Sequence, residues 1–178
     1  GNIWIAPRSV LLWPILDTSV IAVVRAADTF FRVLAVPRAE RGKVLSTTPL
    51  PTLTKAELSF IFLLAGAVVT PQFDVALHRI QYETIGPWGA KAVGSGLLLV
   101  PVGNTKPLPL VVYQHGTLTL KAEAPSTLAS QERYIGAAYA CTGYAAILPD
   151  YLGLGDSPGL HPYHHAVIEA TAGVDLLR

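Results

Sequence analysis

The sequence predicts an α/β domain built on a mostly parallel sheet. Two segments of alternating hydrophobicity are joined by a Gly-Pro turn at residues 86–89, as in a hairpin of half-buried strands. Two short apolar runs, at residues 110–113 and 144–148, are typical of strands that are covered on both faces. Helical segments follow both runs. A hairpin followed by strand, helix, strand and helix is the beginning of an α/β fold.

An earlier helix is expected to begin at Thr54. The Thr54 hydroxyl can accept a hydrogen bond from the Glu57 N–H, and the Glu57 carboxylate can accept one from the Thr54 N–H, which is the capping-box pattern. Residues 58–69 are apolar on nearly every side, so we expect this helix to pack against a sheet or a partner domain. With about a dozen apolar residues it is too short to span a bilayer.

The hairpin strands are expected at residues 75–82 and 95–100. In the first strand the alternation changes phase between Leu77 and Ile80, which indicates a β-bulge.

Two helices complete the predicted domain. The first is expected over residues 130–142, with Gly143 in the left-handed conformation that ends a helix. The second begins near Tyr163, and the chain reaches Arg178 without a glycine or proline that would end this helix. We therefore expect a truncated fold.

Composition limits the partners and cofactors of the protein. Charged residues make up 14% of the chain, against roughly 25% in soluble domains, and the formal net charge is +1. Nucleic acid is therefore not an expected partner. The single cysteine, Cys141, excludes an internal disulfide and a zinc site built on paired thiolates. His161, His164 and His165 cluster without a nearby thiol, so we do not expect a metal site there.

Residues 1–26 are expected to be a secretory signal or a disordered apolar segment. Pro14, Asp17 and Arg25 interrupt the apolar run, whereas a transmembrane helix needs about 20 predominantly apolar residues. Small residues before a cleavage point after Ala26 fit a signal peptide, which favours a secreted or periplasmic protein. The alternative is a buried or poorly ordered segment of a cytoplasmic protein.

The remainder of the chain is expected to divide in two. Residues 27–53 are predicted to be an extended linker, because residues 38–51 mix charge, threonine and proline without apolar periodicity. Residues 54–178 are expected to form the α/β domain.

Two loops at the ends of the buried strands carry the candidate chemistry. His115-Gly116-Thr117 follows the first apolar run, and a glycine there lets the backbone turn and expose amides, as an oxyanion site requires. The second loop runs from 150 to 157. Its candidate substrate-binding residues are Asp150, Tyr151, Gly153 and Gly155.

These two loops, in this order, resemble the α/β-hydrolase superfamily and within it the secretory lipases and esterases. Residues 95–101 (SGLLLVP) and 161–163 (HPY) are similar to the same branch, so the resemblance covers about residues 28–178. It implies an α/β-hydrolase fold, present here as its N-terminal portion. It further implies that an amide of the His115-Gly116-Thr117 loop, above all that of Thr117, donates to the oxyanion.

Ser157 matches the nucleophile pattern G-x-S-x-G but does not fit its chemistry. The residue after a nucleophilic serine gives its N–H to the oxyanion hole, and Pro158 has none. The family order of serine, acid and histidine also fails, since no histidine follows Glu169 or Asp175. We therefore expect Ser157 to be a loop residue and the nucleophile, acid and base to lie beyond Arg178.

The resemblance implies a serine hydrolase that cleaves small-molecule or lipid carboxylic esters through an acyl-enzyme, represented here without its catalytic triad. It implies no metal and no organic cofactor. A peptidase or an acyltransferase of the same superfamily is one alternative. A non-catalytic α/β binding module is another.

Overall fold

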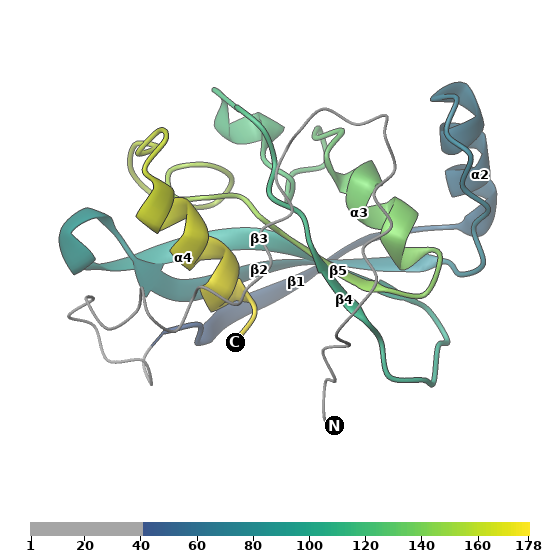
Figure 1. Cartoon of the computed structure of the whole chain (residues 1–178), viewed down its shortest axis with the longest axis horizontal. Helices are drawn as coiled ribbons and strands as arrows, with labels where there is room; N and C mark the ends of the chain where they lie inside the picture. Colours follow the sequence, from purple (N-terminus) through teal and green to yellow (C-terminus); the bar gives the residue numbers. More distant parts are fainter. Residues whose placement is uncertain (1–40) are drawn as a thin grey trace.

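Residues 41–178 are the part of the chain that the computed structural model describes (Figure 1). They form a five-stranded sheet in the order β1-β2-β3-β5-β4. The strands are β1 (Val44–Leu53), β2 (Val75–Ile85), β3 (Lys91–Pro101), β4 (Leu110–Val112) and β5 (Ala145–Pro149). The helices are α2 (Lys55–Leu64), α3 (Arg133–Ala140) and α4 (Ala166–Leu176), with short 3-10 turns η3 (Pro87–Gly89) and η4 (Lys121–Glu123). The predicted signal segment and the first part of the predicted linker lie outside the described residues.

The sheet is mixed within the described residues. The predicted hairpin is confirmed, since β2 and β3 pair antiparallel without interruption from Val75↔Pro101 to Ile85↔Lys91. The β1–β2 and β3–β5 pairs are also antiparallel, and the β4–β5 pair is parallel. Short connections can join only antiparallel neighbours, whereas α3 provides the crossover that a parallel pair needs.

Strand β1 corrects the expected linker. Residues 44–53 do not form an unpaired segment but pair with β2, with register shifts after Val44 and Leu50. The segment lacks apolar periodicity because most of its side chains are exposed on both faces of an edge strand. Pro49 and Pro51 suit such an edge, where not every backbone N–H is needed for the ladder.

The change of phase in β2 does not arise from a bulge between β2 and β3. Instead, the two faces of the sheet are buried at different points along the strand. Leu77 packs into the cluster that includes Ala137 of α3, whereas the Tyr82 hydroxyl donates to the Ala172 carbonyl oxygen of α4 at 2.9 Å. Along a strand, odd-numbered and even-numbered residues such as Leu77 and Tyr82 point to opposite faces of the sheet. Helices α3 and α4 therefore cover opposite faces.

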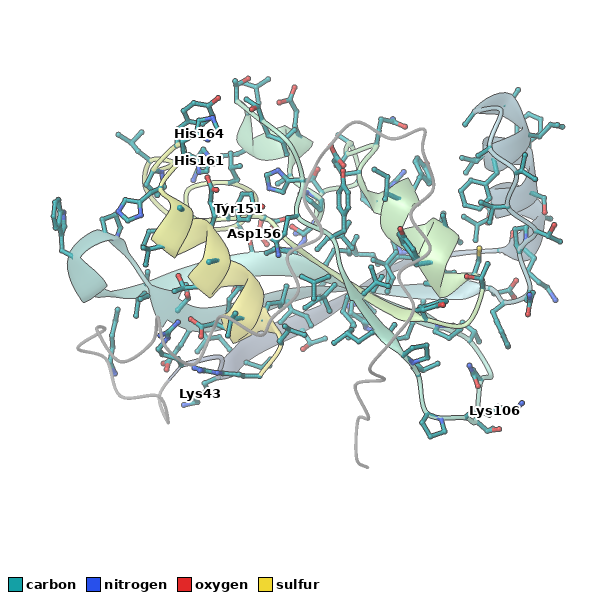
Figure 2. The ribbon with its side chains drawn as sticks, in the orientation of Figure 1. Lys43, Lys106, Tyr151, Asp156, His161 and His164 are labelled. Atoms are coloured by element: carbon teal, nitrogen blue, oxygen red, sulfur yellow. The ribbon has the colours of Figure 1, made fainter. Side chains whose placement is uncertain are left out.

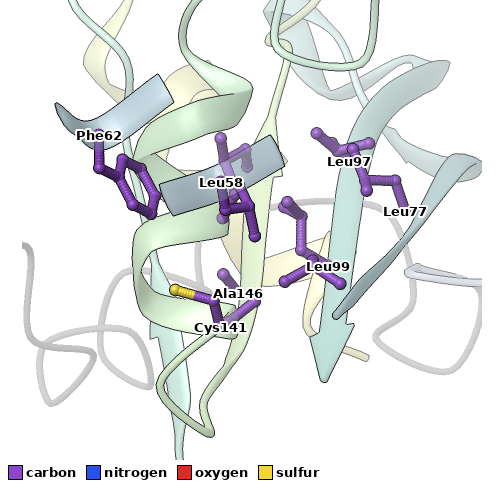
Figure 3. Close-up of a cluster of buried hydrophobic side chains, with 11 residues drawn as sticks. Leu58, Phe62, Leu77, Leu97, Leu99, Cys141 and Ala146 are labelled. Carbon is purple, nitrogen blue, oxygen red and sulfur yellow. The ribbon is translucent and has the colours of Figure 1, made fainter. Parts of the chain in front are cut away.

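The main hydrophobic cluster lies between the sheet and helices α2 and α3 (Figure 3). Its buried members are Leu58, Phe62, Val75, Leu77, Leu97, Leu99, Ala137, Ala140, Cys141, Ala146 and Leu148. Burial raises the pKa of the Cys141 thiol to about 11, so this cysteine is a packing residue and not a nucleophile.

Helix α2 begins as predicted but packs less than expected. The capping box is present, with the Thr54 N–H donating to the Glu57 carboxylate at 2.7 Å. The helix ends at Leu64 and buries only Leu58 and Phe62. Figure 1 shows it at the end of the sheet away from α4. An apolar sequence on all sides therefore did not mean burial on all sides.

The helix expected over residues 130–142 is shorter, covering Arg133–Ala140, and Gly143 has the predicted positive φ of 104°. No helix within residues 41–178 is long and apolar enough to cross a membrane.

Candidate active site

The structure brings the two predicted loops together at one edge of the sheet. Strands β4 and β5 are parallel neighbours, so their carboxyl ends meet at the same side. The His115 Nε2 atom lies 3.1 Å from the backbone oxygen of Asp150, the first residue after β5. The two segments that the sequence analysis singled out therefore form a single site.

Gly116 and Thr117 present free backbone donors. Both residues are exposed, and neither backbone N–H donates a hydrogen bond to any residue of the described chain. A Cβ at Gly116 would meet nothing within 4 Å, and its φ is not positive. Gly116 therefore does not occupy a left-handed conformation, and the space beside its Cα is open. Two exposed N–H groups without a partner in the described residues can stabilise a negatively charged oxygen.

Asp150 has a structural position in the site, and its predicted role in substrate binding stays a prediction. Its side chain has no exposed surface. The carboxylate accepts hydrogen bonds from the Ser95 hydroxyl (2.6 Å), the Ser126 hydroxyl (2.5 Å) and the Ser126 N–H (2.9 Å). Burial raises the pKa of Asp150, while the bonds from Ser126 and Ser95 and the nearby His115 act in the opposite direction. Asp150 thus ties β3, β5 and the segment after the His115 loop into one unit.

Tyr151 connects the two loops through its side chain. Its hydroxyl donates to the Gln114 side-chain oxygen at 2.8 Å, and its ring lies 4.2 Å from that of His115 between centroids. The backbone φ of Tyr151 is +66°, a left-handed value that a bulky residue rarely adopts. Burial raises the pKa of the Tyr151 phenol far out of the physiological range. Tyr151 is 7% exposed, so the structure gives it a supporting position beneath the site.

Gly153 and Gly155 allow the second loop to fold back on itself. Both have positive φ values, +77° and +55°. A Cβ at Gly153 would lie 2.3 Å from the His161 nitrogen, and one at Gly155 would lie within 2.2 Å of the Asp150 carboxylate. Close packing and positive φ values therefore favour glycine at both positions, and their predicted role in substrate binding stays a prediction.

Ser157 is buried and fully engaged in the loop. Its hydroxyl donates to the Val93 carbonyl oxygen at 2.7 Å and accepts from the Gly153 N–H at 3.0 Å. Its side chain therefore has no path to a substrate, in agreement with its rejection as a nucleophile.

Ser157→Ala is expected to lower the free energy of unfolding by about 1–3 kcal/mol, because the buried Gly153 N–H and the part-buried Val93 carbonyl oxygen lose their partner. Thermal unfolding of the two proteins measures the difference. Ser59→Ala is the control, since the Ser59 hydroxyl bonds only to the Lys55 carbonyl oxygen on an exposed helix surface. Equal shifts for the two variants would contradict the assigned role.

The histidines near the start of α4 form part of an aromatic row. Figure 2 shows His161 and His164 beside Tyr151 near the beginning of that helix. The His161 Nδ1 atom faces the Leu152 carbonyl oxygen at 2.8 Å, and its ring stacks on Tyr151. Within residues 41–178, no three His, Cys, Asp or Glu side chains are grouped so that they could hold a metal ion.

Sequence reasoning missed three polar residues of the site. Ser95 and Ser126 hold Asp150, and Tyr163 places its hydroxyl 3.4 Å from the Thr117 hydroxyl. Ser95 and Ser126 come from segments 55 and 24 residues away from Asp150, so no local pattern could have paired them.

Comparison with solved structures tests the resemblance. A protein from Legionella pneumophila that is provisionally assigned as a hydrolase matches with a TM-score of 0.70 and 30% identity over 76% of this chain. The rice cell wall degrading esterase LipA from Xanthomonas oryzae matches with a TM-score of 0.62 and 33% identity over 77% of this chain. The chain belongs to the α/β-hydrolase superfamily. The predicted superfamily and fold class are thereby confirmed.

This α/β-hydrolase chain spans only part of the length of the proteins that it matches. It covers 38% of the Legionella protein and 36% of LipA. Candida antarctica lipase A matches with a TM-score of 0.53 at 16% identity, over 79% of this chain and 33% of the lipase, which shows a shared fold. No protein-family model matches the sequence, and comparison with curated proteins gave no match. The described residues therefore carry a part of the α/β-hydrolase fold.

Proposed function

We propose that this chain supplies the oxyanion-binding part of a serine hydrolase that cleaves carboxylic esters. The observation that carries the proposal is the pair of exposed, unpartnered N–H groups of Gly116 and Thr117 at the carboxyl end of β4. Asp150 and Tyr151 support this loop from the end of β5. Backbone donors fixed beside a rigid sheet edge suit a charge that develops only in the transition state.

The proposed reaction proceeds through an acyl-enzyme. A serine oxygen attacks the ester carbonyl carbon and gives up its proton to a base, and the carbonyl oxygen becomes negatively charged. The Thr117 N–H, with that of Gly116, donates to this oxygen. The tetrahedral species then expels the alcohol, which takes up the proton, and water later releases the acid from the serine.

The serine, the base and the acid are proposed to lie outside residues 41–178. Within that part of the chain, no serine hydroxyl hydrogen-bonds to a histidine ring. The one serine in a nucleophile-like pattern, Ser157, is buried and bonded to backbone groups. The described residues therefore contribute transition-state binding, and the nucleophile must come from elsewhere.

Ester hydrolysis is favoured over peptidase or acyltransferase chemistry because LipA, which is 33% identical to this chain over the matched region, is an esterase. A lipid or small-molecule ester is the proposed substrate. The proposal includes secretion, for which residues 1–26 provide the sequence support.

In the full-length protein, Thr117→Pro is expected to lower kcat on a p-nitrophenyl ester by about 10²–10³-fold, because proline removes the backbone N–H at position 117. Thr117→Ala is the matched control, since it keeps the N–H while losing the same hydroxyl contact to Tyr163. We expect its kcat to stay within about threefold of wild type, consistent with a main-chain donor. A Thr117→Pro protein that melts normally and keeps its kcat would contradict the proposal.

A further inference from the structure

An aromatic row leads from the buried Tyr151 to the surface of the protein. Its members are Tyr151, His161, Tyr163 and His164. The Tyr151 and His161 rings stack with their centroids 6.4 Å apart, and the His161 and Tyr163 rings meet edge to face at 6.1 Å. The Tyr163 and His164 rings also meet edge to face, at 4.1 Å. Figure 2 shows the labelled members of the row leading away from the sheet. Each ring of the row therefore has an aromatic neighbour, and the row ends on exposed residues.

Tyr163 is held in place although it is 56% exposed. Its backbone N–H donates to the His161 carbonyl oxygen at 2.9 Å, and the His165 N–H donates to the Pro162 carbonyl oxygen at 3.1 Å. The φ of His164 is +56°, a left-handed value that residues other than glycine rarely adopt. Two rings and a closed turn therefore fix an aromatic side chain that water still reaches. A side chain that is already ordered loses little conformational entropy when a ligand covers it.

The fixed Tyr163 ring lies beside the proposed oxyanion donor. The Tyr163 hydroxyl oxygen is 3.4 Å from the Thr117 hydroxyl oxygen. The Thr117 hydroxyl and the Thr117 N–H belong to one residue, so the phenol and the amide donor are close neighbours. An ester whose carbonyl oxygen accepts from the Thr117 N–H therefore places a group that flanks the ester within reach of the Tyr163 ring. This position suits contact with the substrate and needs no part in the chemical step.

We infer that Tyr163 is a specificity-determining residue whose ring contacts an aromatic ring of the ester substrate. This inference rests on the proposed function and narrows its substrate class to esters that carry an aromatic ring next to the ester group. Aromatic rings that meet edge to face or offset gain energy beyond the area that they bury, whereas a saturated ring of the same size gains only from burial. The substrate ring extends the aromatic row by one member. The gain corresponds to a preference of about 3- to 10-fold for the aromatic ring.

Two matched esters, hydrolysed by the full-length protein, test the role of the ring. Benzyl phenylacetate carries an aromatic ring on each side of the ester, and cyclohexylmethyl cyclohexylacetate carries saturated rings at the same positions. The measured quantity is the ratio of kcat/KM for the aromatic ester to kcat/KM for the saturated ester. The intrinsic reactivity of each ester cancels when this ratio is compared between variants. Tyr163→Leu should lower the ratio by about 3- to 10-fold, whereas Tyr163→Phe, which keeps the ring and loses only the hydroxyl, should keep the wild-type ratio.

Tyr144→Leu is the matched control. Tyr144 is 39% exposed and its ring meets that of Tyr139 edge to face at 6.1 Å, so it resembles Tyr163 in exposure and in aromatic contact. It precedes β5, at the opposite end of that strand from the site. This variant should keep the wild-type ratio. An unchanged ratio in Tyr163→Leu, or an equal decrease in Tyr163→Phe, would overturn the inference.

Inhibition of the wild-type protein provides a second measurement that needs no variant. With p-nitrophenyl acetate as substrate, benzyl alcohol should have an inhibition constant about 3- to 10-fold lower than that of cyclohexylmethanol. Cyclohexylmethanol is the more apolar of the two alcohols, so burial alone would give the reverse order. Equal or reversed constants would contradict an aromatic contact. Failure of the proposed function is distinguishable, because Thr117→Pro would then keep its kcat, whereas failure of this inference alone leaves the loss in Thr117→Pro in place.

Discussion

Asp150→Ala is expected to lower the free energy of unfolding by at least about 3 kcal/mol, because each buried donor left without an acceptor costs about 1–3 kcal/mol. Three donors lose their partner, namely the Ser95 hydroxyl and the hydroxyl and N–H of Ser126. All of these groups are buried, so water cannot take the place of the carboxylate. Chemical denaturation of the full-length Asp150→Ala and wild-type proteins measures the difference in their free energies of unfolding.

Asp156→Ala provides a control from the same loop. The Asp156 carboxylate pairs with Arg79 at 3.2 Å, and both side chains are partly exposed. Such a pair contributes about 0–1 kcal/mol, so this variant should unfold close to wild type. If Asp150→Ala were no less stable than Asp156→Ala, the buried carboxylate would not be the anchor of the site.

The pH dependence of stability should carry the signature of Asp150. Burial raises the pKa of Asp150 above its ordinary value of 3.8. At a pH between 3.8 and the raised pKa, Asp150 therefore holds a proton in the folded state that it has released in the unfolded state. The stability that protonated Asp150 contributes is therefore fully present below pH 3.8 and is lost as the pH rises through the raised pKa. Asp150→Asn should lack this part of the slope, and an unchanged slope would contradict the assignment.

Gly153→Ala is expected to lower the free energy of unfolding by about 2–5 kcal/mol, from about 1–3 kcal/mol of overpacking and about 1–2 kcal/mol for a left-handed alanine. The new methyl group would lie 2.3 Å from the His161 backbone nitrogen and 2.4 Å from the Leu160 carbonyl carbon. Both contacts are to backbone, so no side-chain rotation relieves them. Kcat should also fall, because the segment that stacks on Tyr151 must move.

Gly159→Ala separates the two contributions. Its φ of +82° is close to the +77° of Gly153, but a Cβ there would meet nothing within 4 Å. This variant should show only the conformational cost of about 1–2 kcal/mol. The difference between the two unfolding midpoints then measures the steric contact alone, and a difference of zero would show that the loop relaxes without cost.

The sequence by itself determined the superfamily, the hairpin and the capping box at Thr54. These features depend on short-range patterns: alternation, apolar runs and a three-residue cap spacing. The sequence also placed residues 115–117 and 150–157 after two apolar runs, and the parallel pairing of β4 and β5 brings the ends of those strands to the same sheet edge.

Only the tertiary structure decided what each residue of those loops does. The Asp150 carboxylate became an anchor because Ser95 and Ser126 reach it from 55 and 24 residues away, and the Ser157 hydroxyl is held by Val93, 64 residues away. Residues 44–53 became a strand because β2 offered an edge to pair with, although the segment has no apolar period of its own. Hydrogen bonds and close packing between distant segments leave no periodic trace in a sequence, so their outcome appears only when the chain is folded.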